Sequence, residues 1–187
     1  MTRLIWLIGP SGAGKDSLLA ALRHQQIPEL LVAHRYITRT ADAGGENHIA
    51  LSDAEFSQRA ACGLFALAWQ ANGYRYGLGI ELDHWLAAGM NVIVNGSRQH
   101  LPHAMERYGA RLLPVMLQVS NDVLRRRLEA RGRETPDAIE QRLRRASHFG
   151  THLPHCAILN NDGSLQQSAT ALIQLIRHAP EEKRNVC

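Results

Sequence analysis

The feature that most constrains this chain is a short apolar segment followed at once by a glycine-rich loop that ends in lysine. Leu4–Ile8 (LIWLI) predicts a buried strand, Gly9–Lys15 reads GPSGAGK, and Asp16–His24 predicts a helix. Glycines let the backbone turn so that its N–H groups point inward, which creates an anion-binding nest at a helix N-terminus. In this strand–loop–helix context the pattern GxxxxGK predicts a phosphate-binding loop rather than an ordinary turn, with Lys15 reaching the β- and γ-phosphates of a nucleotide.

Asp16 occupies a position where such loops carry a Ser or Thr whose hydroxyl ligates magnesium. Mg²⁺ takes hard oxygen donors, commonly one or two carboxylates together with phosphates and waters. The Asp16 carboxylate is therefore the preferred magnesium ligand, direct or through water. Ser17 is the alternative, and the two are not expected to face the same ion because one residue on a helix rotates about 100°.

Composition indicates one domain without membrane segments. The 187 residues are 45% hydrophobic, which is ample for a core, and none of the apolar runs approaches the roughly 20 residues of a membrane span. The N-terminal MTRLIWLIGP is too short for a signal peptide. Three cysteines without metal-site spacing favour a reduced, cytoplasmic setting. We expect no membrane partner.

Arginine dominates the positive charge. The net charge is +4, and the only lysines among the 21 basic residues are Lys15 and Lys183. Eight arginines fall between Arg125 and Arg145, but aromatic residues are not interleaved with them and acidic residues are. We therefore expect no nucleic acid partner. Arginine forks suit small phosphorylated ligands, although a solvated helix face is an alternative for about half of these residues.

Strands and helices alternate along most of the chain, which predicts an α/β fold with a parallel sheet covered by helices on both faces. The further predicted strands are Leu30–His34, Asn91–Asn95, Leu112–Val119 and Ala157–Asn160. The further predicted helices are Ser52–Cys62, Ile80–Ala88, Leu101–Tyr108, Asp122–Arg131, Pro136–His148 and Leu165–His178. Residues 36–79 break this rhythm with a glycine-rich loop, a short helix and a hairpin, and they predict a small insert.

The motifs outside the loop resemble the guanylate kinase branch of the nucleoside monophosphate kinases, and the resemblance spans Leu4 to about Arg177. Matching segments are ITRT at 37–40, GE at 45–46, SDAEF at 52–56, NGYRYG at 72–77, RLEARG at 127–132 and QRL at 141–143. The resemblance implies one P-loop kinase domain over residues 1–187. Its core is about 1–35 and 80–178, its acceptor-binding insert about 36–79, its ATP lid about 131–140, and its frayed tail 179–187.

Departures from that branch concern base recognition. Leu67 falls where guanylate kinases carry the acid that reads guanine, and Asp42 falls on the second arginine of their phosphate clamp. His48 replaces a tyrosine. Loss of a polar group aimed at a base edge removes discrimination, so a guanine site is not expected.

A narrower set of segments is similar to the ribose 1,5-bisphosphate phosphokinase family. These are GKDSLL at 14–19, HRYITR at 34–39, ENHIALS at 46–52, VNGSR at 94–98 and LNNDGSL at 159–165. That family carries Asp after the loop lysine. The resemblance implies transfer of the ATP γ-phosphoryl group to ribose 1,5-bisphosphate, giving 5-phosphoribosyl 1-diphosphate during phosphonate breakdown.

This chemistry needs no general base, because the accepting phosphate oxygen is already anionic and catalysis reduces to positioning and charge stabilisation. The residues expected to hold ATP are Gly9, Pro10, Ser11, Gly12, Ala13, Gly14, Lys15, Asp16 and Ser17. Those expected to stabilise the transferring phosphoryl group are Lys15, Arg131, Arg133 and Arg142. Those expected to bind the acceptor are Arg39, Glu46, His48, Arg75, Tyr76, Asn95, Ser97 and Arg98, with Glu46 either bonding a hydroxyl or ordering its loop.

Two other functions remain open. A kinase for another phosphorylated molecule, including a nucleoside monophosphate, would use the same loop. A non-catalytic guanylate-kinase-like binding module is disfavoured because this chain keeps the loop glycines and Lys15. His148, His152 and His155 lack regular ligand spacing, which favours a solvated loop over a metal site. The three tryptophans are expected in the core: Trp6, Trp69 and Trp85.

Overall fold

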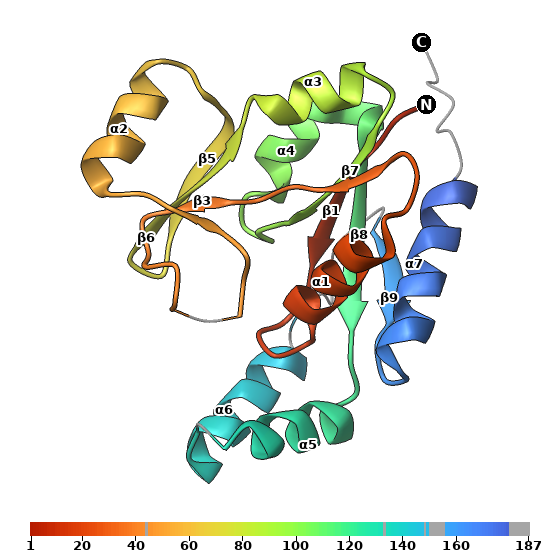
Figure 1. The fold of residues 1–187 in the computed structure, drawn as a ribbon. Coiled ribbons are helices and arrows are strands. Elements are labelled where there is room, and N and C mark those ends of the chain that lie inside the picture. Colours follow the sequence, from red (N-terminus) through yellow and green to blue (C-terminus); the bar gives the residue numbers. More distant parts are fainter. Residues whose placement is uncertain (44, 133, 148, 150–155, 180–187) are drawn as a thin grey trace.

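The computed structural model of the chain describes residues 1–43, 45–132, 134–147, 149 and 156–179. Its core is a sheet of five parallel strands in the order β2-β7-β1-β8-β9 (Figure 1). The strands are β1 (Leu4–Ile8), β2 (Leu30–Val32), β7 (Asn91–Asn95), β8 (Leu112–Gln118) and β9 (Ala157–Asn160). All five residues of β1 are fully buried, as expected for the central strand of a sheet covered on both faces.

Alternate residues of β1 face two different hydrophobic clusters. Ile5 and Leu7 pack with apolar residues of α1 (Lys15–Gln25) and α7 (Leu165–His178). Leu4, Trp6 and Ile8 pack with residues of α3 (Glu81–Ala87) and α4 (Leu101–Tyr108), which a short 3₁₀ turn (Gly109–Arg111) connects to β8. The period of two along β1 therefore places one helical layer on each face of the sheet, and the predicted fold class is confirmed.

Residues between β2 and α3 form a second, four-stranded sheet beside the core. Its order is β4-β3-β6-β5, built from β3 (Tyr36–Ile37), β4 (Ile49–Ala50), β5 (Phe65–Ala71) and β6 (Tyr74–Gly79). The β5–β6 hairpin turns through Asn72 and Gly73, both at positive φ, which is the geometry that a two-residue hairpin loop favours. The helix α2 (Asp53–Ala61) covers this sheet through Phe56, whose ring lies 4.5 Å from that of Phe65. We call this sheet and α2 the insert.

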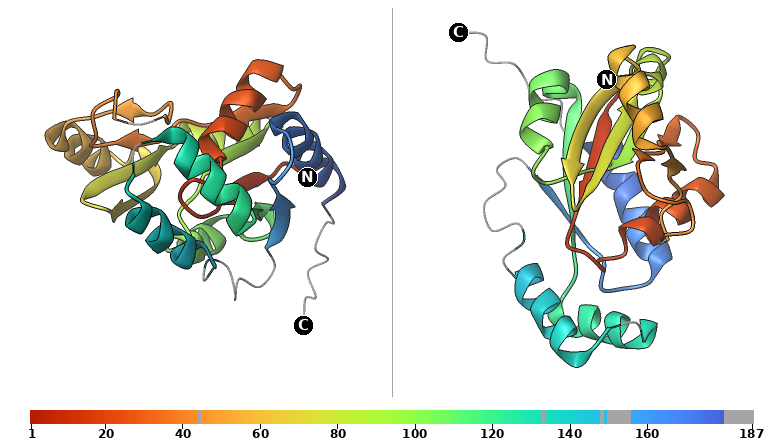
Figure 2. Two further views of the ribbon diagram at one scale, coloured as in Figure 1. Left: turned by 90° about the horizontal axis from the view of Figure 1, so that it is seen from below. Right: turned by 90° about the vertical axis from the view of Figure 1, so that its left-hand side faces the viewer.

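Two helices extend beyond the carboxyl end of β8. These are α5 (Asn121–Arg131) and α6 (Pro136–Ser147), and they lie on the side of the molecule toward which β1 and β8 point (Figure 1). Seen from below, the helical pair lies in front of the phosphate loop that follows β1, and the insert lies to one side (Figure 2). The carboxyl edge of a parallel sheet is where such folds bind ligands, so this arrangement locates the site.

The elements predicted from sequence are present, and their ends differ from the prediction by no more than two residues. The largest difference is β2, which ends at Val32 rather than His34. The strands β3 and β4 were not predicted, because two residues carry no periodic pattern. Among the described residues, none of the helices is both long and apolar enough to cross a membrane.

Candidate active site

The phosphate loop takes its shape from glycines in the left-handed region. Gly12 and Gly14 have φ of 91° and 97°, which residues with a side chain rarely adopt. Gly14 is also the N-cap of α1, and its carbonyl accepts a hydrogen bond from the Leu18 N–H at 3.0 Å. The chain therefore passes directly from the loop into a helix N-terminus, where anions are stabilised.

The phosphate loop is stabilised by hydrogen bonds from side chains that were not predicted from the sequence. The buried Asn161 donates from Nδ2 to the Ala13 carbonyl at 2.6 Å and accepts at Oδ1 from the Ser168 hydroxyl at 2.6 Å. Arg127 on α5 donates to the carbonyls of Asn161 (2.7 Å) and Ala13 (3.4 Å). A Cβ at Gly14 would lie 2.7 Å from Asn161 Nδ2, so the loop and this support fit closely. Sequence signals this contact only through the LNNDGSL match, which gives no partner.

Lys15 points back into the loop. Its Nζ donates to the carbonyl oxygens of Gly9 at 2.7 Å and Pro10 at 3.2 Å. Burial lowers the pKa of Lys15 to about 8; the Asp16 carboxylate opposes this shift and the Arg35 guanidinium adds to it. The ammonium group is thus held within the nest, in surroundings that favour its charge less than water does.

Asp16 and Asn95 meet across the gap between α1 and β7. The Asn95 amide donates from Nδ2 to Asp16 Oδ1 at 3.1 Å, which fixes the orientation of the carboxylate. Beyond Asn95, the chain turns against Trp6, whose indole N–H donates to the Ser97 carbonyl at 3.0 Å. Gly96 is needed here, because a Cβ would lie 2.5 Å from the indole ring.

Glu46 joins two arginines on the insert side of the site. It accepts from Arg35 Nε at 2.6 Å and Nη2 at 2.5 Å, and Arg39 Nη2 lies 3.5 Å away. Burial alone would raise the pKa of Glu46, but hydrogen bonds and charge from Arg35, followed by the charges of Arg39 and His48, hold it below its usual value. His48 is buried, with ring nitrogens 3.1 Å from the Arg39 carbonyl and 3.2 Å from the Glu46 carbonyl. His48 therefore stabilises the segment between Arg39 and His48 and does not line the cavity.

Stacked rings form the wall behind Arg35. The Arg35 guanidinium lies 4.9 Å from the centre of the Tyr76 ring, and Tyr76 stacks on Trp69 at 5.5 Å with 7° between the planes. Trp69 also stacks on His100 at 5.1 Å. Trp69 was predicted as core, and it does pack against the buried cluster around Trp6, but it lines the site as well.

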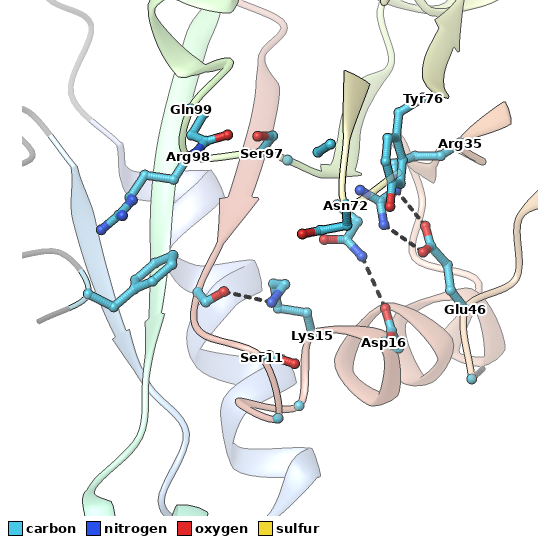
Figure 3. Close-up of a pocket in the computed structure, with 18 of the residues that line it drawn as sticks. Ser11, Lys15, Asp16, Arg35, Glu46, Asn72, Tyr76, Ser97, Arg98 and Gln99 are labelled. Atoms are coloured by element: carbon cyan, nitrogen blue, oxygen red, sulfur yellow. Dashed lines mark hydrogen bonds and ion pairs between the residues drawn. The ribbon is translucent and has the colours of Figure 1, made fainter. Parts of the chain in front are cut away.

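These groups surround one cavity of about 680 Å³ (Figure 3). The predicted site residues that line it are Gly9, Ser11, Gly12, Gly14, Lys15, Asp16, Ser17, Arg39, Glu46, Tyr76, Asn95, Ser97, Arg98 and Arg131. Sequence reasoning missed other lining residues, among them Arg35, Asn72, Gln99 and Phe149. Arg35 lay within the matched HRYITR segment, so a signal for it existed.

Some predicted residues lie elsewhere. Arg75 was expected to bind acceptor phosphate, but it donates to Ser57 Oγ at 2.6 Å and lies 4.3 Å over the Phe56 ring, so the structure does not bring it to the cavity. Arg142 pairs with Glu134 at 2.6 Å and donates to Ser11 Oγ at 2.9 Å, beside a neighbouring cavity between α6 and the loop. Arg133, His148, His152 and His155 lie outside the described residues.

Comparison with known proteins agrees with this geometry. A family model described as an AAA domain matches residues 5–147. The ribose 1,5-bisphosphate phosphokinase PhnN of Enterobacter lignolyticus is 62% identical over 175 residues, covering 94% of this chain and 92% of that protein. The protein of the same name from Klebsiella pneumoniae is 59% identical over 181 residues, covering 96% of each. The chain belongs to the ribose 1,5-bisphosphate phosphokinase family.

The chain shares its fold with a solved guanylate kinase structure. Guanylate kinase from Anaplasma phagocytophilum superposes with a TM-score of 0.68 at 18% identity, covering 98% of this chain and 87% of that one, which shows a shared fold. The family resemblance and the kinase class predicted from sequence are confirmed. As a kinase with an intact phosphate loop, the chain uses a nucleotide as its phosphoryl donor.

Proposed function

We propose that this chain transfers the γ-phosphoryl group of ATP to ribose 1,5-bisphosphate, the substrate in the names of its relatives. An oxygen of the phosphate on C1 forms a bond to the γ-phosphorus as the bond from that phosphorus to the β,γ-bridging oxygen breaks. The products are ADP and 5-phosphoribosyl 1-diphosphate. The proposed setting is phosphonate breakdown in the cytoplasm.

The observation that carries this proposal is the charge of the 680 Å³ cavity, which is lined by both the phosphate loop and the insert. Among the described residues that line it, the cations are Lys15, Arg35, Arg39, Arg98 and Arg131, and the anions are Asp16 and Glu46. Such an excess of positive charge suits two polyanions brought close together. A neutral acceptor would not need it.

The residues around the cavity fit phosphoryl transfer without a general base. The acceptor oxygen is already ionised, so the protein has to align two phosphates and stabilise the charge that develops between them. We assign that stabilisation to Lys15, Arg131 and Arg142. Arg142, on α6 just after residues 131–140, lies outside this cavity but donates a hydrogen bond to Ser11 of the phosphate loop. This contact supports a role for residues 131–140 as a lid over ATP.

The donor set at the loop also fits Mg²⁺. No group of three or more His, Cys, Asp or Glu side chains converges within the described residues, so a cage built from protein ligands is not indicated there. Mg²⁺ bound with a nucleotide takes most of its ligands from phosphates and waters and one or two from carboxylates. Asp16 faces the cavity and would hold the ion, whose chemistry would be to neutralise charge on the phosphates.

Guanylate kinase activity is the second candidate, because the fold is shared. Leu67, at the base-reading position, is 8% exposed and packs in the cluster around Trp6. A buried leucine offers no hydrogen bond to a base edge. This observation favours the sugar phosphate as acceptor.

The test is ³¹P NMR of the protein with ATP, Mg²⁺ and ribose 1,5-bisphosphate. We expect ADP and a new pair of diphosphate signals from the product to appear together. Lys15→Ala protein serves as the control for contaminating kinases and should give neither. Consumption of ATP with GMP but not with ribose 1,5-bisphosphate would replace the proposal by the guanylate kinase alternative.

A further inference from the structure

The proposed acceptor carries two phosphates with different fates, and this inference rests on that proposed function. The phosphate on C1 forms the new bond, whereas the phosphate on C5 stays unchanged throughout. A selective site must recognise the second phosphate, because ribose 1-phosphate would otherwise serve equally well. The question is which cation of the cavity recognises it.

The positions of the cations divide them between the ATP side and the acceptor side of the cavity. Lys15 lies within the phosphate loop and Arg131 ends α5, so both belong to the ATP side. Arg98 extends away from the insert, and its guanidinium lies 4.5 Å over the Phe149 ring (Figure 3). Arg35 and Arg39 remain for the acceptor side, where both contact Glu46.

Arg35 is fixed in place by three contacts. Its Nε and Nη2 are bound by the two oxygens of Glu46, and its flat face lies on the Tyr76 ring. Its side chain is 13% exposed. The remaining nitrogen, Nη1, carries two N–H groups that can donate hydrogen bonds. It has no hydrogen-bond partner within the described part of the chain. Arg35 therefore presents a fixed, charged donor at the cavity wall.

Arg39 is held more loosely. Its Nη2 makes two contacts, to Glu46 and to His48 Nδ1, and both measure 3.5 Å. Its Nε is buried without a hydrogen-bond partner among the described residues. A buried donor left unpaired is unfavourable, so Arg39 is a group that gains from an incoming anion and can move toward it.

We propose that Arg35 is the residue that recognises the C5 phosphate of the acceptor, through Nη1, and that Arg39 binds the phosphate that reacts. A phosphate that keeps its charge and position during transfer is suited to a rigid cation, since uniform binding needs no adjustment. The reacting phosphate gains a bond and shifts its charge, which suits the cation that can follow it. Arg35 thus sets specificity for a bisphosphate over a monophosphate.

The experiment compares two acceptors that differ in the C5 phosphate alone. Binding of ribose 1,5-bisphosphate and of ribose 1-phosphate is measured by isothermal titration calorimetry for wild type, Arg35→Met and Arg39→Met. Methionine keeps much of the arginine stem and its packing on Tyr76. We expect Arg35→Met to weaken the bisphosphate about ten- to hundredfold, the usual effect of losing a charged hydrogen bond, and to change ribose 1-phosphate less than about twofold. Arg39→Met should weaken both ligands.

Two further variants separate recognition from folding. Arg35→Met leaves the Glu46 carboxylate without its main partner, so the double variant with Glu46→Gln removes that buried charge and should show the same loss of selectivity. Arg59→Met is the matched control, because Arg59 also pairs with an acid, Glu55, and also lies over a tyrosine ring, Tyr36, but outside the cavity. It should leave both affinities unchanged.

Several results would overturn the inference. Equal weakening of both ligands by Arg35→Met, or wild-type affinity for the bisphosphate in that variant, would show that Arg35 does not read the C5 phosphate. Equal affinity of the wild type for the two ligands would show that this phosphate is not recognised at all. These outcomes are distinct from failure of the proposed function, which is absence of turnover of ribose 1,5-bisphosphate by the wild type.

Discussion

The side-chain amide of Asn95 donates a hydrogen bond to the carboxylate of Asp16 over 3.1 Å, which links the end of β7 to the first turn of α1. This bond occupies Oδ1, which fixes the direction of the other carboxylate oxygen. Asp16 lies one residue after the loop lysine, so its carboxylate is next to the phosphates that the loop would bind. An oriented carboxylate at this point is the basis for the first prediction.

Asp16→Asn should raise the magnesium concentration that gives half-maximal rate, because it keeps an oxygen donor but removes the charge. Asp16→Ser should retain more activity than Asp16→Ala, since a hydroxyl can still coordinate Mg²⁺. The measurement is initial rate against free Mg²⁺ at saturating ATP. Ser17→Ala is the matched comparison. If it shifts the magnesium dependence while Asp16→Ala does not, the ligand is Ser17.

Arg131→Ala and Arg142→Ala should lower kcat much more than they raise KM for ATP. Arginines that act on a transferring phosphoryl group are worth about 10³–10⁵ in rate, because their contact strengthens in the transition state. Steady-state kinetics with varied ATP gives both constants. Arg125→Ala, which breaks an exposed pair with Glu140 on the same two helices, should leave both nearly unchanged. A rise in KM with kcat intact would mean that Arg131 and Arg142 hold nucleotide only in the ground state.

The sequence predicted the fold and the strand–loop–helix geometry of the phosphate loop well, because both depend on local patterns. The Leu4–Ile8 segment, the glycines of the loop and Lys15 are contiguous, and their geometry follows from strand, turn and helix rules. The neighbouring strand Asn91–Asn95 also had a clear apolar run. Because parallel strands share one carboxyl edge, the meeting of Asp16 with Asn95 was foreseeable in outline.

The acceptor side was less predictable, because it depends on contacts between residues far apart in the chain. Arg75 belongs to the same motif as Tyr76, yet successive residues of a strand face opposite sides, and Arg75 packs on α2 while Tyr76 lines the cavity. The support of the loop by Asn161 spans 148 residues and has no local signature. The fixed position of Arg35 at the cavity depends on its pairing with Glu46, which the sequence does not reveal.

Asn161→Ala should lower the free energy of unfolding by about 2–4 kcal/mol, since it leaves both the Ala13 carbonyl and the Ser168 hydroxyl without this buried partner. It should also raise KM for ATP, because Ala13 lies in the phosphate loop. Chemical denaturation followed by circular dichroism measures the first effect. Ser168→Ala removes one of the two bonds and should have a smaller effect. An unchanged unfolding midpoint in Asn161→Ala would contradict this account of the loop.

GMP should be a poor acceptor compared with ribose 1,5-bisphosphate. Leu67 is buried and apolar, so a polar edge of guanine placed against it would lose its hydrogen bonds to water without gaining one from the protein. That loss costs about 1–3 kcal/mol, or about ten- to hundredfold in kcat/KM. Parallel assays of ADP release with each acceptor give the ratio. Similar values of kcat/KM for the two acceptors would show that base recognition is achieved elsewhere in the insert.

The rate at limiting ATP should fall above about pH 8. Burial lowers the pKa of Lys15 to about 8 in the free protein, so the ammonium form, which attracts the polyphosphate, is progressively lost as pH rises through that value. Because kcat/KM reports ionisation of the free enzyme, kcat/KM for ATP should decrease tenfold per pH unit on the alkaline side.

Bound phosphates favour the charged form of Lys15 and raise its pKa, so kcat at saturating ATP should stay level to higher pH. Phosphate groups titrate near pH 6 and do not account for an alkaline limb. Lys15→Arg, whose guanidinium keeps its proton throughout, should lose that limb in whatever activity it retains. A kcat/KM profile of the wild type that stays flat through pH 8 and above would show that Lys15 is fully protonated in the free enzyme.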